Sequence, residues 1–400
     1  MKEWCAALVL WLSVAATAAP GALVVADFEE PQEFRIAESV AGSLRYEFAS
    51  EENRGHFLCV EFTRLQNSGF AYIYLPIADA LSGSAEDYDG ISFMVRGDGS
   101  STFGTVEMRF DGFVNIFQAV FPLDCTEWRR VDIRWDEFFQ MNDGVRKAEM
   151  NWDTLNRFAL GSRGMWGSCS YAIDDIALAS IEPREPRQAY RGMARLERTG
   201  EKLRKEGAQL TIAALGDSIT FGTRLPADER EDATYLARLA AGIEERFAGA
   251  AVKTVNAGVG GDTIARGIVR IGHQVAYHEP DLVLVYLGAN DAMYALPESR
   301  VRHAMSLLVE KLLETTDADI LLLGPTQILG KPGLPESYGR IYASIARERG
   351  VAYFDLSEAL SMLTESDFRN ALADNVHLSA YGHRVIADAI LDFVAERVQR

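Results

Sequence analysis

The sequence has few cysteines and fewer basic than acidic residues. Four cysteines occur in 400 residues, all in the first half, and no CxxC pair or Cys/His cluster predicts a zinc site. Lysine and arginine total 40 against 58 acidic residues, which gives a formal net charge of −18. This charge disfavours nucleic acid and anionic membranes as partners, and strongly acidic polymers as substrates. No internal repeat, low-complexity tract or later transmembrane stretch is visible.

The first residues have the pattern of a signal peptide. Met1–Lys2 precede an apolar run from Trp4 to Ala16, and Ala16-Thr17-Ala18 offers small residues for cleavage after Ala18. The run is shorter than the ~20 apolar residues of a spanning helix. A membrane anchor is the alternative, because the Lys2/Glu3 start is weakly basic. We predict a signal peptide over 1–18, a secreted or periplasmic protein, and no membrane span after its removal.

Export would leave three cysteines in an oxidising compartment. Cys59, Cys125 and Cys169 are then expected to form one disulfide and a free thiol, or to remain three buried thiols. The second half of the chain contains no cysteine, so its fold must be stable without disulfides.

Residues 21–180 read as a series of short strands. Turn clusters such as Arg96–Ser100 and Asp111-Gly112 separate them. Apolar residues alternate with polar ones at Val106, Met108 and Phe110. The expected strands include 44–48, 57–62, 71–75, 90–95, 105–110, 117–121, 130–134 and 171–178. This spacing predicts an all-β, antiparallel jelly-roll sandwich.

The composition changes at residues 181–207. Pro183 and Pro186 break regular structure, and the charged run that follows predicts a linker turning into a solvated helix. From 208 to 400, apolar strands alternate with amphipathic helices. Strands are expected at 210–215, 252–256, 282–287, 320–323 and 352–354, and helices near 234–247, 263–277, 298–314, 336–349 and 379–398. This order predicts an α/β three-layer domain whose parallel sheet is covered on both faces.

Ligands of such sheets bind at the carboxyl ends of the strands, and polar motifs follow three strands here. They are Ala214-Leu-Gly-Asp-Ser-Ile-Thr-Phe-Gly222, Val255-Asn-Ala-Gly-Val-Gly-Gly-Asp262 and Tyr286-Leu-Gly-Ala-Asn-Asp291, while Asp374-Asn-Val-His-Leu-Ser379 precedes the last helix. In order and spacing these pieces resemble the four signature blocks of the SGNH (GDSL-type) hydrolase superfamily. The resemblance covers about residues 210–400 and implies a flavodoxin-like fold and serine esterase activity.

The residue types fit that chemistry. A serine hydroxyl such as that of Ser218 is a weak nucleophile until a base removes its proton, and His377 has the pKa range that suits this task. Asp374, three residues earlier, is near enough to fix the tautomer of the imidazole. The family resemblance assigns the oxyanion hole to the Ser218 N–H, the Gly260 N–H and the Asn290 amide. Asp217 and Asp291 are interpreted as supporting residues, and no cofactor or metal is expected in this domain.

Other polar residues have ordinary explanations. Ser218 alone would also suit a helix N-cap. We interpret His383 as structural, Asp262-Thr263 as a helix start, and His273, His278 and His303 as surface residues. The segment Gln327–Ser337, rich in Gly and Pro, is expected to border the substrate cleft. No long apolar lid is visible, which favours a short acyl group.

The front domain resembles galactose-binding-like jelly rolls, including carbohydrate-binding modules and the domain of complex I intermediate-associated proteins. The resemblance is carried by Asp27-Phe-Glu29, Gly90–Gly97, Trp128–Trp135 and Ile173–Ile176. Acidic residues near the two ends of the domain are candidates for a structural Ca²⁺. We expect Trp128 and Trp135 to be core residues, and Trp166 to be the better candidate for stacking on a sugar.

A jelly roll before an SGNH domain resembles bacterial carbohydrate esterases. We therefore expect a carbohydrate acetylesterase whose partner is an acetylated glycan or another small-acyl ester. The alternatives are a lysophospholipase or thioesterase, a glycan O-acetyltransferase, and a glycan-binding protein whose hydrolase fold is silent. Some relatives work with a Ser–His pair, so the need for Asp374 is left open, as are the sugar and the oligomeric state.

Overall fold

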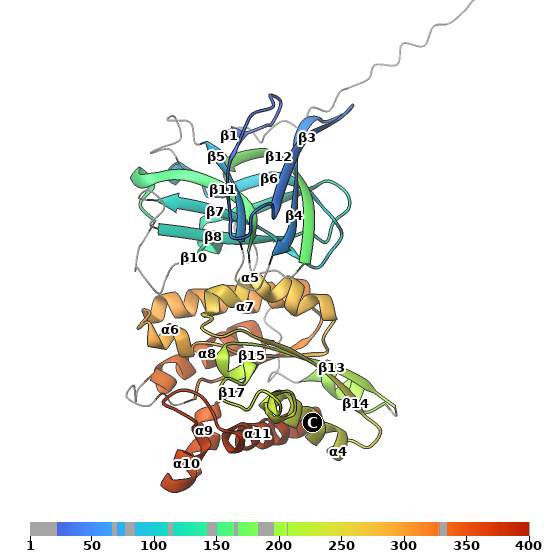
Figure 1. The fold of residues 1–400 in the computed structure, drawn as a ribbon, viewed down its shortest axis with the longest axis vertical. Helices are drawn as coiled ribbons and strands as arrows, with labels where there is room; N and C mark the ends of the chain where they lie inside the picture. The colour runs from blue at the N-terminus through green and yellow to red at the C-terminus, as the bar shows by residue number, and fades with distance from the viewer. Residues whose placement is uncertain are drawn as a thin grey trace, which may run out of the picture.

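The computed structural model describes residues 22–65, 70–76, 85–110, 115–141, 150–163, 167–182, 196–205, 207–326, 328 and 334–399. The predicted signal peptide, Trp166, most of the linker and most of 327–337 lie outside these residues. The prediction of an antiparallel sandwich followed by a parallel α/β domain is confirmed (Figure 1). The proposed domain boundaries stay predictions.

Within the described residues, the front domain has two six-stranded sheets whose strand pairs are all antiparallel. The first has the order β3-β4-β12-β6-β9, with β1 paired to β12: β1 Leu23–Ala26, β3 Leu44–Glu51, β4 Gly55–Leu65, β6 Gly90–Gly97, β9 Arg129–Arg134, β12 Gly167–Ala179. The second has the order β10-β8-β7-β11-β5-β2: β2 Arg35–Glu38, β5 Phe70–Pro76, β7 Phe103–Phe110, β8 Asn115–Pro122, β10 Phe139–Gln140, β11 Leu155–Arg163. Short 3-10 turns occur at η1 Ala85–Asp87, η2 Trp135–Glu137 and η3 Trp152–Thr154.

The core of the sandwich follows from strand alternation. Val106, Met108 and Phe110 of β7 join the buried cluster between the sheets. Trp135 packs against the same cluster, as expected, and its indole N–H donates to the Tyr88 carbonyl at 2.7 Å. The expectation for Trp128 is wrong: it is only half-buried, and the guanidinium of Arg54 lies 4.0 Å from its ring centroid. Trp128 packs edge-on against the buried Phe57, with ring centroids 5.1 Å apart, while Arg54 and Arg96 cover its ring near solvent.

The three cysteines of the sandwich are free thiols. Cys169 is buried, while Cys59 and Cys125 are partly exposed. Burial raises the pKa of Cys169 to about 12, so this thiol stays protonated and behaves as a small apolar side chain. Of the two alternatives left open by the cysteine count, the structure has the disulfide-free one.

The structural Ca²⁺ suggested for the acidic residues of the front domain stays a prediction. Arg54 lies against both carboxylates of the Asp174–Asp175 pair, at 3.0 and 3.1 Å. A guanidinium therefore supplies positive charge at this pair. The described residues contain no group of three or more His, Cys, Asp or Glu arranged to hold a metal ion.

The second domain contains a five-stranded parallel sheet of order β14-β13-β15-β16-β17 within the described residues. Its strands are β13 Gln209–Gly216, β14 Ala251–Gly258, β15 Leu282–Tyr286, β16 Asp319–Leu323 and β17 Ala352–Phe354. The helices are α1 Glu197–Leu203, α2 Ser218–Phe221, α3 Arg230–Ala233, α4 Tyr235–Arg246, α5 Ile264–Gln274, α6 Ala289–Met293, α7 Glu298–Thr315, α8 Leu334–Arg349, α9 Leu356–Ser361, α10 Glu365–Ala371 and α11 Ala380–Gln399, with a 3-10 turn at η4 Ala276–His278. None of the described helices combines the length and apolar composition needed to cross a membrane.

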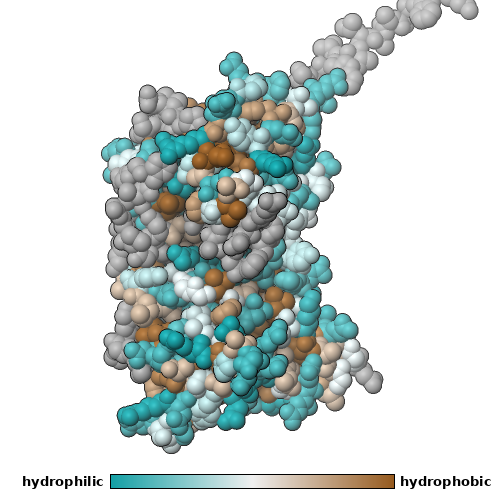
Figure 2. Space-filling model, in the orientation of Figure 1, coloured by the Kyte–Doolittle hydropathy of each residue, from teal (hydrophilic) through white to brown (hydrophobic). Residues whose placement is uncertain are grey.

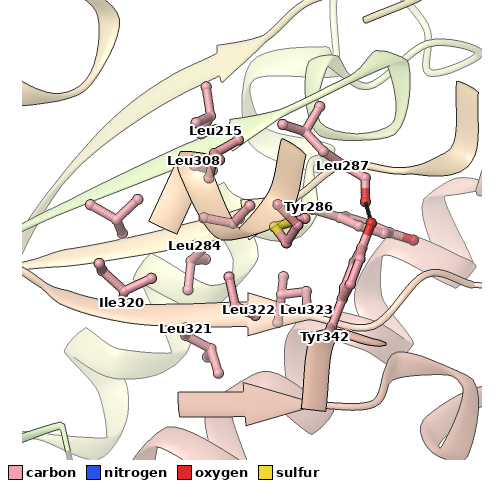
Figure 3. Close-up of a cluster of buried hydrophobic side chains, with 14 of the residues drawn as sticks. Leu215, Leu284, Tyr286, Leu287, Leu308, Ile320, Leu321, Leu322, Leu323 and Tyr342 are labelled. Atoms are coloured by element: carbon pink, nitrogen blue, oxygen red, sulfur yellow. Dashed lines mark hydrogen bonds between the residues drawn. The ribbon is translucent and has the colours of Figure 1, made fainter. Parts of the chain in front are cut away.

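The central strands are buried on both faces, as their continuous apolar sequences predict. All five residues of β15 are buried, and their neighbours form the cluster in Figure 3. At its edge, the Tyr342 hydroxyl donates to the Leu287 carbonyl at 2.9 Å (Figure 3). Helices α5 and α7 cover the sheet face toward the sandwich, and α4 and α11 cover the opposite face (Figure 1).

Helix α1 is more buried than the charged sequence around it predicted. The charged run was expected to form a solvated helix, but Thr199 and Gly200 are buried against the α/β domain. The Thr199 N–H donates to Asp319 at 2.7 Å, and the Arg204 guanidinium donates to the Val398 carbonyl at 3.1 Å. The long charged side chains remain near solvent while the small residues between them pack inward.

The two domains share an interface along α5 and α7. Front-domain residues Phe103, Val120, Phe139 and Met141 belong to the same buried cluster as the α/β core. The Lys311 ammonium lies 3.4 Å from the Glu137 carboxylate, and a ring nitrogen of His303 lies 3.0 Å from the Phe138 carbonyl oxygen. His303 is therefore an interdomain contact and not the surface residue expected. On the face shown in Figure 2, hydrophilic residues cover most of both domains.

Candidate active site

The end of β13 presents Ser218 at the start of a short helix. Asp217 caps this helix, α2, by accepting a hydrogen bond from the Ile219 N–H at 2.9 Å. Gly216 is required just before it, because a Cβ there would lie 1.9 Å from the Thr220 hydroxyl oxygen. Ser218 is partly exposed, whereas its neighbours Asp217 and Ile219 are buried. The local sequence thus holds one hydroxyl at the edge of the sheet.

His377 and Asp374 meet that hydroxyl from the far end of the chain. The His377 Nε2 lies 2.9 Å from the Ser218 Oγ, and its Nδ1 lies 2.8 Å from the Asp374 Oδ2. A backbone hydrogen bond from the Ala373 N–H to the His377 carbonyl closes the turn, and the buried Leu378 anchors it. The structure therefore brings together the three residues that the sequence predicts.

The electrostatics of Asp374 favour the carboxylate form. Burial opposes ionisation, but the backbone N–H groups of His377 and Val376 donate to its Oδ1 at 2.8 and 2.9 Å. The side chains of His377 and Arg224 add to them, and together these donors hold the pKa of Asp374 well below its usual range. A permanently ionised carboxylate beside Nδ1 keeps the proton there and leaves Nε2 as an acceptor facing Ser218.

The loop after β14 carries Gly260. The Val259 N–H donates to the Gly216 carbonyl at 3.1 Å, which holds this loop beside the strand end that leads to Ser218. Gly260 is exposed, and a Cβ built on it would meet no heavy atom within 4 Å. Its backbone is therefore open to a small ligand in a way that the neighbouring buried residues are not.

Asn290 follows β15 on the short helix α6. The preceding Gly288 has φ 118°, and a Cβ there would lie 2.2 Å from the Tyr342 hydroxyl. The Asn290 Nδ2 donates to the Asp262 carbonyl at 2.9 Å, so one amide hydrogen fixes the side chain to the Gly260 loop. Asn290 itself is partly exposed. Each of the three predicted oxyanion donors thus belongs to a partly exposed or exposed residue at a strand end.

The two supporting aspartates have structural contacts. The Asp291 carboxylate accepts a hydrogen bond from the Ile264 N–H at 3.1 Å, at the start of α5, where Thr263 is the N-cap as predicted. Burial raises the pKa of Asp217 to about 7. His383, predicted to be structural, is fully buried and accepts from the Tyr235 N–H through Nδ1 at 3.1 Å.

Sequence reasoning missed two arginines of this region. The buried Arg270 of α5 pairs with the Asp262 carboxylate at 2.7 Å and also donates to the Gly216 and Ala257 carbonyls. Arg224, after α2, donates to Asp374 at 2.7 Å. Arg270 lies among Ile268, Val269 and Ile271 on the helix, and this apolar setting was a signal for the first. Nothing local in the sequence marks the second, because its partner lies 150 residues away.

Hydrogen bonds link the Asp374 carboxylate to the His377 imidazole and the imidazole to the Ser218 hydroxyl. This arrangement is the catalytic triad of a serine hydrolase. Residues 214–385 match the GDSL-like Lipase/Acylhydrolase family, and residues 39–170 match the Complex I intermediate-associated protein 30 (CIA30) family. The C-terminal domain of this chain belongs to the GDSL-type (SGNH) hydrolases, and the protein is a carboxylic ester hydrolase.

Similar proteins include an acetylxylan esterase of Geobacillus stearothermophilus, 28% identical over 207 residues, which are 47% of this chain and 94% of that protein. An arylesterase of Vibrio mimicus is 28% identical over 134 residues, 34% of this chain and 60% of that protein. Among solved structures, a two-domain esterase (CEX) active on acetylated mannans has a TM-score of 0.42 at 23% identity, covering 50% of this chain and 52% of that chain. This chain thus spans about half the length of that esterase.

Proposed function

We propose that this protein removes O-acetyl groups from a carbohydrate through an acyl intermediate on Ser218. The observation that carries the mechanism is the hydrogen-bonded series Asp374–His377–Ser218, with separations of 2.8 and 2.9 Å. His377 takes the proton of the Ser218 hydroxyl as its oxygen attacks the ester carbonyl carbon. The carbonyl oxygen becomes an oxyanion. The N–H groups of Ser218 and Gly260 and the Asn290 amide stabilise it.

The remaining steps return the enzyme to its starting state. The imidazolium of His377 donates its proton to the departing sugar oxygen, and the tetrahedral carbon expels that alcohol to leave acetyl-Ser218. Water then attacks the acyl carbon while His377 removes its proton. Collapse of the second tetrahedral intermediate releases acetic acid and restores the Ser218 hydroxyl. Each step uses only groups of this chain and water.

The choice of substrate is supported by the relatives. The match to the acetylxylan esterase covers 94% of the length of that protein. Thioesterase/lysophospholipase relatives match over 55% of their length. Exposed apolar side chains of Phe221, Met293 and Tyr294 lie one turn or less after Ser218 and Asn290. They offer contact surface for an acyl or alcohol group near the nucleophile, and do not by themselves select acetyl.

The test is acetate release from a panel of acetylated xylans and mannans, with Ser218→Ala as control. Wild-type protein should release acetate, and Ser218→Ala should lose about a thousandfold or more of that activity. Full activity of Ser218→Ala would refute the mechanism. A strong preference for p-nitrophenyl octanoate over the acetate ester would favour the lysophospholipase or thioesterase alternative. Acetyl transfer to an acceptor glycan in place of hydrolysis would identify an acetyltransferase.

We also propose that the enzyme is exported, on the strength of the Met1–Ala18 pattern. Polysaccharide substrates lie outside the cell, so export and the proposed substrate support each other. Mass spectrometry of the mature protein from its native host should show an N-terminus at Ala19. Retention of Met1 in a cytoplasmic fraction would contradict this.

A further inference from the structure

Arg224 connects the nucleophile's segment of the chain to the base's segment. Its Nε donates to the Asp374 Oδ2 at 2.7 Å, the same oxygen that lies 2.8 Å from the His377 Nδ1. Arg224 lies six residues after Ser218, whereas Asp374 lies just before His377. The side chain of Arg224 is 58% exposed and that of Asp374 29%. A solvent-accessible guanidinium therefore contacts the carboxylate that orients the imidazole.

The backbone around Arg224 is held in an unusual conformation. Arg224 has φ 78°, in the left-handed region that is costly for a residue with a Cβ, and Gly222 has φ 83°. The Thr223 N–H donates to the Ser218 carbonyl at 2.9 Å, and Leu225 is only 4% exposed. The hydrogen bond of Thr223 ties the loop to α2 before Arg224, and the buried side chain of Leu225 anchors it to the core after Arg224. A disfavoured conformation held in this way is often linked to function.

The carboxylate of Asp374 needs a partner of this kind. Its Oδ1 is fixed by two backbone N–H groups of its own turn, at 2.8 and 2.9 Å. Its Oδ2, which faces the imidazole most closely, has only side-chain partners in the described region: His377 and Arg224. The His377 Nδ1 also lies 3.0 Å from Oδ1, so without Arg224 the backbone would still hold one carboxylate oxygen near the ring. Oδ2, the nearer oxygen, would then have only His377 as its partner among the described residues.

We infer that Arg224 is a positioning residue for the Asp374–His377 pair, an inference that rests on the proposed function. Arg224 holds Oδ2 in line with Nδ1 and so keeps Nε2 directed at Ser218. The charged and titratable groups facing His377 are Asp374 on its own turn, Arg224 on the α2 loop and the buried His383 on α11. Arg224 is the cation of this set.

Two other roles for Arg224 make different predictions. An ion pair that serves only stability, at this exposure, contributes little, so its removal would leave the kinetics of the folded enzyme unchanged. An arginine that binds substrate directly would change KM for the glycan. A positioning residue changes turnover of every ester, including one too small to reach beyond Ser218.

The experiment compares Arg224→Gln and Arg224→Lys with wild type, using p-nitrophenyl acetate across pH 5 to 9. Arg224→Gln should lower kcat/KM by about 5- to 10-fold, the size expected of one charge-assisted, partly solvated hydrogen bond. The loss should fall on kcat and leave KM for this small ester nearly unchanged, because Arg224 contacts Asp374 and not the ester. Arg224→Lys should recover part of the rate. Arg246→Gln, which breaks the exposed Arg246–Asp392 pair, is the matched control and should change neither kcat nor KM.

A second arm places Arg224→Gln in an Asp374→Asn background. If Arg224 acts through the Asp374 carboxylate, the second substitution should add less than a twofold change there, because coupled residues are not additive. Equal losses in both backgrounds, or an Arg224→Gln enzyme with the rate of wild type, would overturn the inference. Failure of the proposed function looks different, since wild-type protein would then hydrolyse no ester, prefer the octanoate ester or transfer acetyl groups to an acceptor glycan.

Discussion

Arg270 donates a hydrogen bond from Nη2 to the Gly216 carbonyl, at 3.1 Å, two residues before Ser218. The same guanidinium donates to the Ala257 carbonyl at 2.8 Å and to the Asp262 carboxylate at 2.7 Å. It therefore joins the carboxyl ends of β13 and β14 to the loop that carries Gly260. Arg270 is 1% exposed, so these hydrogen bonds replace nearly all of the water that its charge would otherwise bind.

Replacing Arg270 should destabilise the protein strongly. Arg270→Met would leave the Asp262 carboxylate buried without its cation, and we expect the free energy of unfolding to fall by about 3–5 kcal/mol. Urea denaturation followed by circular dichroism measures this. Arg246→Gln, which breaks a surface pair, should change the free energy by no more than about 0.5 kcal/mol. Equal stability of Arg270→Met and wild type would show that the buried pair does not support the fold.

Gly260 and its neighbour Gly261 should respond oppositely to alanine. A Cβ on Gly260 meets no atom, and its φ lies outside the left-handed region, so Gly260→Ala should fold normally. Its methyl group would occupy the space where we place the substrate carbonyl, so kcat/KM should fall by about tenfold or more.

Gly261 has φ 78°, and Gly261→Ala should lower the thermal midpoint because alanine is strained there. Thermal unfolding and p-nitrophenyl acetate hydrolysis, measured on both variants, separate the two effects. A fully active Gly260→Ala enzyme would argue against Gly260 as an oxyanion donor.

His383 should make stability depend on pH. Burial, followed by the charges of Arg238 and His377, lowers its pKa to about 4, whereas the unfolded chain titrates near the ordinary value of 6.5. The unfolded state therefore binds the proton first as the pH falls. Stability should be constant above pH 6.5 and decline between pH 6.5 and 4, by up to about 3 kcal/mol from this residue.

His383→Asn offers an acceptor in place of Nδ1 but no group that titrates in this range. We expect a smaller stability difference between pH 7 and pH 5 in this variant than in wild type, measured by urea denaturation. The same pH dependence in both proteins would assign the effect to other groups.

Gly272 should control the docking of the two domains. A Cβ at Gly272 on α5 would lie 2.2 Å from the Ser101 carbonyl oxygen of the front domain, and backbone cannot move aside as a side chain can. Gly272→Val should push the sandwich off α5 and expose Phe103 and Phe139, which now pack against the α/β core. Small-angle scattering should then show a larger radius of gyration, and the thermal midpoint should fall. Ala241→Val, on the exposed face of α4, controls for the effect of a β-branched residue in a helix.

Several expectations from the sequence hold because they depend on neighbouring residues. The change from alternating to continuous apolar strands predicted a sandwich followed by an α/β domain, since each period reflects which faces of a strand are covered. Ser218 was found because its motif follows a strand, and Asp374 and His377 because their motif precedes the last helix. Trp128 and α1 were misjudged because partial burial depends on what packs against a residue, which the local sequence does not state.

By itself the sequence determined the order of strands and helices, and the short motifs that place a serine and an asparagine after strands and a histidine before the last helix. Only the tertiary structure decided which partner each arginine contacts. Arg224 pairs with Asp374, Arg54 pairs with Asp174, and Arg270 pairs with Asp262 and donates to the Gly216 carbonyl. The physical reason is range. Hydrophobic periodicity and turn chemistry act over a few residues, whereas an ion pair between segments far apart in the chain forms only after folding has brought them within a few ångströms.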